Sequence, residues 1–143
     1  MATVRIANAA GFWGDWLEAP KRTVEAADVD YLTLEYLAEL TLSVLAHQRS
    51  RNPDAGYVTD FPLVLESLTS SLASQQQLKI ITNAGGMNPA ACARETARIL
   101  VGQGLPHESV GVVTGDDLLS RFEDLSQAGE TFSHMETGEP LGD

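Results

Sequence analysis

Two patterns of apolar residues alternate along the chain. Short apolar runs predict strands at residues 4–7, 31–35, 78–82 and 110–113. Apolar residues at helical spacing predict the helices between them. One helix has Pro20 in its first turn and runs to about Ala27, and the helix opened by Asn88 and Pro89 ends at Gly102. The helix after the second strand has the expected apolar stripe Leu37, Leu40, Val44 and Leu45. The next helix is capped by Asp60 and has the stripe Phe61, Val64, Leu65, Leu68 and Leu72. The stripe of the Pro89 helix is Ala90, Ala93, Ala97, Leu100 and Val101.

Strands that alternate with helices predict an α/β fold, with a doubly wound and mainly parallel sheet of the Rossmann or flavodoxin-like type and helices on both faces. The length of 143 residues fits a single domain over 1–143. After Gln127 the sequence is polar, has two glycine-containing turns and reaches no further strand. We therefore expect residues 1–143 to be an incomplete, N-terminal portion of a longer domain.

Polar and glycine residues gather where the predicted strands end, whereas the connections that enter the strands, such as 75–77, resemble plain surface. Ligands of open parallel sheets bind beyond the carboxyl ends of the strands. This asymmetry predicts a site at that edge. The candidate acid–base residues are Glu35, Glu39 and Asp116, and the candidate substrate- or anion-binding residues are Asn8, Gly11, Asn83, Gly85, Gly86 and Asn88.

The glycine pair before the Pro89 helix has two interpretations. Gly85 and Gly86 lack Cβ atoms and precede a helix N-terminus, which favours an anion subsite beside Asn83. On that interpretation Gly86→Val would abolish ligand binding and leave the sheet intact. The alternative is a plain turn in which Asn88 caps the helix.

The candidate carboxylates predict a local charge effect. Glu35 and Glu39 are four residues apart and share the predicted edge with Asp15 and Asp116. If they converge, like-charge repulsion raises the pKa of one carboxyl, or a divalent cation neutralises the group. Mg²⁺ would suit Asp116 and Asp117, although helix capping is the more common role of such residues. No metal-ligand spacing is present, so we predict no metal site and leave the cofactor unassigned.

Composition narrows the function classes. Nine basic and 20 acidic residues give a net charge of −11, which opposes binding to nucleic acid or to anionic membranes. The dinucleotide motif G-x-G-x-x-G is absent. Cys92 is the single cysteine, and the chain has no secretory signal and no apolar run long enough to span a membrane. These features predict a cytoplasmic protein.

Six segments together resemble the acyclic terpene utilisation proteins of the AtuA type: residues 8–15, 34–39, 59–61, 82–89, 115–117 and 137–141. The resemblance implies a role in the bacterial breakdown of citronellol- and geraniol-like isoprenoids, which proceeds through CoA thioesters. Members of that family are longer than this chain, and the resemblance supplies no catalytic residues.

Two main classes of function follow. The first is an enzyme, or part of one, that acts on a branched acyl-CoA or carboxylate metabolite in a reaction of unknown type. The second is a non-catalytic subunit that binds such a ligand or a partner protein at the same edge. A nucleotide-binding half-domain is a weaker alternative. The expected partner is a small molecule, such as a CoA thioester, together with a second subunit or further copies of the chain.

Overall fold

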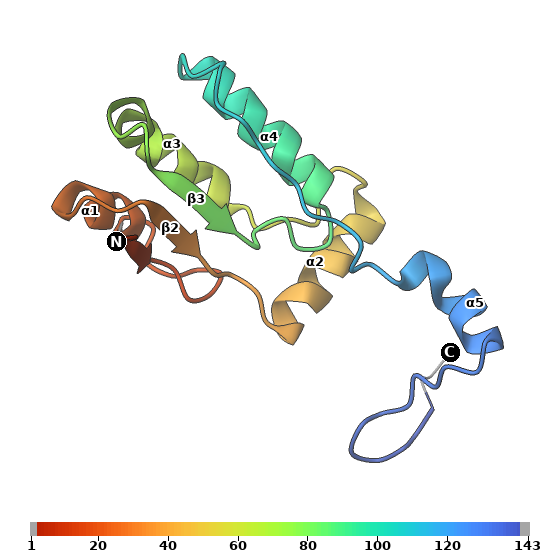
Figure 1. Ribbon diagram of the computed structural model, residues 1–143. Coiled ribbons are helices and arrows are strands. Elements are labelled where there is room, and N and C mark those ends of the chain that lie inside the picture. The colour runs from red at the N-terminus through yellow and green to blue at the C-terminus, as the bar shows by residue number, and fades with distance from the viewer. Residues whose placement is uncertain (1–2, 141–143) are drawn as a thin grey trace. The chain divides into compact units, whose positions relative to one another are not determined.

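The computed structural model describes residues 3–140 and divides the chain into two compact units, residues 1–113 and 114–143 (Figure 1). The first unit contains the sheet and the four longer helices. The second contains two short helices.

The sheet has the order β1-β2-β3, and both strand pairs are parallel. β1 covers Ile6–Asn8, β2 Tyr31–Leu34 and β3 Lys79–Thr82. Three of the predicted strands are thus confirmed with ends shifted by one or two residues. The α/β class and the parallel sheet are confirmed as well.

The helices of the first unit are α1 (Ala19–Ala26), α2 (Glu39–Arg51), α3 (Asp60–Ser74) and α4 (Pro89–Gly102). α1 packs on α3, and α3 packs on α4. Connections between parallel neighbours are right-handed, so two successive crossovers in the same direction place their helices on the same face of the sheet. The order β1-β2-β3 therefore explains why α1 and α3 share one layer.

Burial alternates along the strands, as this arrangement requires. Leu32 and Leu34 are buried toward the helices, whereas Ile6 and Ile81, on the opposite face, are 68% and 55% exposed. A doubly wound sheet carries helices on both faces, and residues 3–140 provide the helix layer on one of them. The second face is open in this part of the chain.

The apolar stripe expected on α3 is confirmed, but two other helices bury a different face. In α2 only Leu45 is buried, and Leu40 and Val44 are exposed. In α4 the buried residues are Ala91, Cys92, Ile99 and Leu100, not the alanines of the predicted stripe. Larger side chains remove more apolar area from water than alanine does, so Ile99, Leu100 and Cys92 decide which face of α4 turns inward.

The fourth predicted strand is wrong. Residues 110–113 form no ladder with the sheet, and Val113 is 94% exposed. A short apolar run does not by itself distinguish a strand from an extended loop, and Gly111 in its centre weakens strand formation.

The second unit contains a 3₁₀-helix, Leu119–Arg121, followed by α5 (Phe122–Gln127). The Asp117 carboxylate accepts a hydrogen bond from the Leu119 N–H at 3.0 Å, but the N-cap position of this turn is Leu118, so the expected cap at Asp116 or Asp117 is not formed. The rings of Phe122 and Phe132 lie 4.7 Å apart and join the helix to the segment after it. No strand follows within the described residues, and residues 141–143, including the last position of the motif at 137–141, lie outside them.

Candidate functional site

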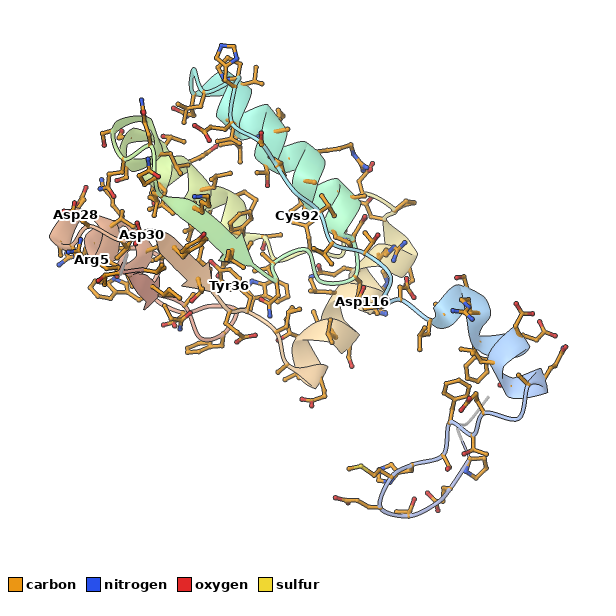
Figure 2. All side chains as sticks on the ribbon, in the orientation of Figure 1. Arg5, Asp28, Asp30, Tyr36, Cys92 and Asp116 are labelled. Carbon is orange, nitrogen blue, oxygen red and sulfur yellow. The ribbon has the colours of Figure 1, made fainter. Side chains whose placement is uncertain are left out.

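The three strands end at one edge of the sheet, here called the carboxyl edge, and three loops leave the sheet there: residues 9–18, 35–38 and 83–88. Parallel pairing places these loops side by side. In Figure 2 the labelled Tyr36 lies where β2 and β3 end.

Glu35 and Asn83 meet across the ends of β2 and β3. The Asn83 side-chain amide donates to Glu35 Oε1 at 2.8 Å, and Asn83 Oδ1 accepts from the Tyr36 N–H at 2.9 Å. The Leu37 N–H also donates to Glu35 Oε1, at 2.8 Å. Asn83 thus joins two adjacent loops, and Glu35 Oε2 is the carboxylate oxygen left for a ligand.

Asn8 holds the first two strands together. Its Oδ1 accepts from the Thr33 hydroxyl at 2.8 Å, and its amide donates to the Ala10 carbonyl at 3.2 Å. These bonds fix the start of the loop that contains Gly11.

Two carboxylates organise the loop after β1. Asp15 accepts from the Gly11 N–H at 2.9 Å and from the Trp16 N–H at 2.7 Å. Asp60, from the start of α3, accepts from Trp13 Nε1 at 3.2 Å and from the Gly14 N–H at 3.0 Å. The loop is therefore folded around two carboxylates.

Asp15 and Asp60 each differ from the sequence-based expectation. Hydrogen bonds from the Gly11 and Trp16 N–H groups lower the pKa of Asp15, so the predicted rise from like-charge repulsion does not occur at this carboxyl. Asp60 is the first residue of α3 rather than its cap, because its carboxylate is engaged by the neighbouring loop.

Tyr36 lies beneath this edge as part of the core. It is 2% exposed, and its hydroxyl is the buried side-chain oxygen that has no hydrogen-bond partner within residues 3–140. Burial raises the pKa of Tyr36 to about 12, and the negative charges of Asp60 and Asp15 add to the shift. The phenol is therefore protonated at neutral pH and is a hydrogen-bond donor.

The glycine-containing turn after β3 is occupied by internal contacts. The N–H groups of Gly86, Met87 and Asn88 donate to the carbonyls of Asn83, Gly56 and Gly85. Asn88 caps α4 by accepting from the Ala91 N–H at 3.2 Å, as predicted, and its amide donates to two carbonyls of the loop before α3.

The two glycines of this turn pack closely against their neighbours. A Cβ on Gly86, whose φ is +49°, would collide with the Leu45 side chain and lie 3.1 Å from the Gly56 carbonyl oxygen. A Cβ on Gly85 would lie 2.9 Å from Pro89. Both glycines are thus needed for packing, and the anion subsite stays a prediction.

The remaining acid–base candidates are Glu39 and Asp116. Glu39 is exposed and starts α2, so no helical turn joins it to Glu35, which precedes the helix. Asp116 belongs to the second unit. Residues 3–140 contain no cluster of three or more His, Cys, Asp or Glu side chains that could hold a metal ion.

Cys92 faces the core from α4 (Figure 2). Burial raises the pKa of its thiol to about 11, so little thiolate is present at neutral pH. The thiol therefore packs in the core rather than acting as a nucleophile.

A shallow groove of about 350 Å³ lies at the opposite end of the strands, where Figure 2 labels Arg5, Asp28 and Asp30. Its polar groups are engaged in part by the fold: the Arg5 N–H donates to Asp30 at 2.8 Å, and the Gln75 amide donates to the Val24 carbonyl at 2.9 Å. These bonds stabilise the loops that enter the strands.

Sequence reasoning did not select Tyr36 or Asp60 as site residues. The signal for Tyr36 is the alternation Leu32, Leu34, Tyr36, which continues the buried face of β2 past the end of the strand. The contact of Asp60 with Trp13 spans 47 positions in sequence, and no local pattern indicates it.

The parallel sheet and its helix layer define an α/β protein with an open sheet, and polar side chains lie at the carboxyl edge of that sheet. The model of the acyclic terpene utilisation family AtuA matches residues 4–143. This chain belongs to that family. Comparisons with curated proteins and with solved structures give no match. No helix within residues 3–140 has the length and apolar character needed to cross a membrane.

Proposed function

We propose that the carboxyl edge of the sheet binds an intermediate of acyclic isoprenoid breakdown, as a branched carboxylate or its CoA thioester. The observation that carries this proposal is the family match over residues 4–143, because the description of that family names acyclic terpene utilisation. The proposed setting is the cytoplasm, where the single cysteine stays reduced.

The chemistry of the edge supports this proposal. Polar side chains stand at the strand ends, and the loop after β1 exposes Phe12 and Trp16 at 58% and 57%. An isoprenoid needs both kinds of contact, since its hydrocarbon chain binds apolar surface and its oxygen needs hydrogen-bond donors.

Glu35 is the acid–base residue that we favour, because its Oε2 has no hydrogen bond within the described residues. Glu39 and Asp116 are the remaining acid–base candidates. The proposed ligand contacts are those predicted from the sequence, namely Asn8, Gly11, Asn83, Gly85, Gly86 and Asn88.

A non-catalytic binding subunit is the second candidate function. It is favoured by the two hydrogen bonds that Glu35 Oε1 accepts from Asn83 and Leu37, which give this carboxylate a structural task.

The test incubates the full protein with citronellate, geranate and their CoA thioesters, and follows binding and conversion by mass spectrometry. Binding with turnover that Glu35→Gln abolishes supports an enzyme, and Glu25→Gln on α1 is the matched control. Binding without turnover supports the binding subunit. Failure to bind any of these compounds contradicts the proposed function.

A further inference from the structure

The loop after β1, residues 11–17, has unusual surroundings for a surface loop. Its outer side exposes Phe12, Trp16 and Leu17, which are 58%, 57% and 40% accessible. Its backbone is held by hydrogen bonds to the carboxylates of Asp15 and Asp60. Large exposed apolar side chains gathered in one segment are typical of an interaction site.

The buried Tyr36 hydroxyl provides an independent observation. A buried polar group without a partner costs free energy that a hydrogen bond would recover. The hydroxyl is a donor, because the phenol stays protonated, and it lies near enough to Asp60 and Asp15 for both charges to affect it. What it requires is an acceptor atom.

We propose that Tyr36 and the loop of residues 11–17 form the binding site for the oxygen-bearing end of an acyclic hydrocarbon ligand, and that this oxygen is uncharged. The Tyr36 hydroxyl donates to the ligand oxygen, and Phe12, Trp16 and Leu17 contact the hydrocarbon. The inference rests on the proposed function. Of the two forms proposed there it favours the thioester over the free carboxylate, and it extends the ligand class to neutral alcohols and esters.

The charge of the ligand head follows from the two aspartates. The negative charges of Asp15 and Asp60 both act on the phenol, and each carboxylate accepts hydrogen bonds from the loop. A carboxylate bound to the Tyr36 hydroxyl would face two like charges in a partly dehydrated position. A hydroxyl or carbonyl oxygen avoids this repulsion.

Access to the hydroxyl requires the loop to move. The contacts of Asp60 with Trp13 and Gly14 are side-chain contacts, which separate without breaking the sheet. Gly14 has a φ of +96°, and the space at its Cβ position is open within the described residues, so no side chain packs against the loop in that direction. The loop is therefore the cover of the site.

The test compares three ligands with the same hydrocarbon chain by calorimetry on the full protein: citronellol, methyl citronellate and citronellate. At pH 7 we expect at least one of the two neutral compounds to bind about tenfold more tightly than the carboxylate. The stronger of the two shows whether a hydroxyl or a carbonyl oxygen is preferred.

Tyr36→Phe is the decisive variant. We expect it to weaken binding of the preferred neutral ligand about five- to tenfold, in line with the loss of one hydrogen bond. Its Tm should equal or exceed that of the wild type, because the hydroxyl removed has no hydrogen-bond partner within residues 3–140. Tyr31→Phe, on the open face of β2, is the matched control and leaves the affinity unchanged.

Three results overturn the inference alone: equal binding of citronellate, unchanged affinity in Tyr36→Phe, or a Tm loss of several degrees in that variant. The last result would mean that the hydroxyl is bonded to Asp60 or to a trapped water. Failure of all three ligands to bind overturns the inference too. Absence of binding by the CoA thioesters as well contradicts the proposed function itself.

Discussion

The loops that follow β1 and β3 leave the same edge of the sheet, and both contain two glycines. In the loop after β3, the backbone donors are used inside the protein and Gly86 packs on Leu45. In the loop after β1, the donors reach carboxylate side chains, and aromatic residues face solvent. The loop after β3 is thus the tightly packed one, whereas the loop after β1, with its exposed aromatic side chains, has the features of a binding element.

The largest expected effect is that of Gly86→Val. The new side chain collides with Leu45 and demands a left-handed backbone angle from a β-branched residue, so we expect a loss of about 3 kcal/mol in unfolding free energy. Denaturant titration measures it. Gly14→Ala in the other loop is the control and should cost about 1 kcal/mol, since only its φ is unfavourable. A stable Gly86→Val variant that has lost ligand binding would restore the anion-subsite interpretation.

Asp60→Ala tests whether the loop after β1 depends on side-chain contacts. Two donors, Trp13 Nε1 and the Gly14 N–H, lose their acceptor, and we expect a destabilisation of about 2 kcal/mol. Tryptophan fluorescence should shift to longer wavelength as Trp13 becomes more exposed. Asp60→Asn keeps one acceptor oxygen and should cost about half as much. Equal effects of the two variants would mean that charge, not hydrogen bonding, holds the loop.

A smaller effect is expected for Asn83→Ala, which removes the link between the two neighbouring loops. The Tyr36 N–H and Glu35 Oε1 each lose one partner, at a cost of about 1 kcal/mol. Amide hydrogen exchange at Tyr36 should accelerate, whereas exchange within α3 should not change. Unchanged protection of the Tyr36 amide would show that the link is not formed in solution.

The smallest effect concerns pH. Hydrogen bonds from Gly11 and Trp16 hold the pKa of Asp15 below its usual value of 3.8. The stabilisation by the ionised carboxylate is complete well above pH 3.8 and is lost as the pH falls through the lower pKa of the folded state. The Tm difference between wild type and Asp15→Asn should therefore be constant near pH 6 and shrink below pH 3.8. Asp28→Asn, at the opposite end of the strands, is the control, and a difference independent of pH would contradict the assignment.

Much of the fold could be predicted because it depends on local patterns. The alternation of β2, the stripe of α3 and the cap at Asn88 are all properties of neighbouring residues. The buried face predicted for α4 was wrong because the pattern counted alanines as apolar residues. Alanines bury little area, so the larger side chains decided which face of the helix packs inward. The strand expected at residues 110–113 requires a partner edge, which no local pattern specifies.

The candidate site was predictable in place but not in its contacts. The ends of the predicted strands placed Glu35 and Asn83 at the carboxyl edge, and the structure brings these two side chains together there. The contact between Asp60 and Trp13 and the unpaired Tyr36 hydroxyl depend on tertiary packing between distant segments. Residue types alone favoured the glycines, because the absence of a side chain suits both a binding loop and a close-packed turn.

Within residues 3–140 the sheet is covered on one face, and this cover sets how freely the strand residues can vary. Along β2, Leu32 and Leu34 face the helix layer, and Tyr31 and Thr33 face the open side. A deep mutational scan of this strand, read out as cellular abundance, should therefore show tolerance with a period of two. Polar replacements should be accepted at 31 and 33 and rejected at 32 and 34, so that the strand can acquire new surface chemistry at every second position without loss of the core.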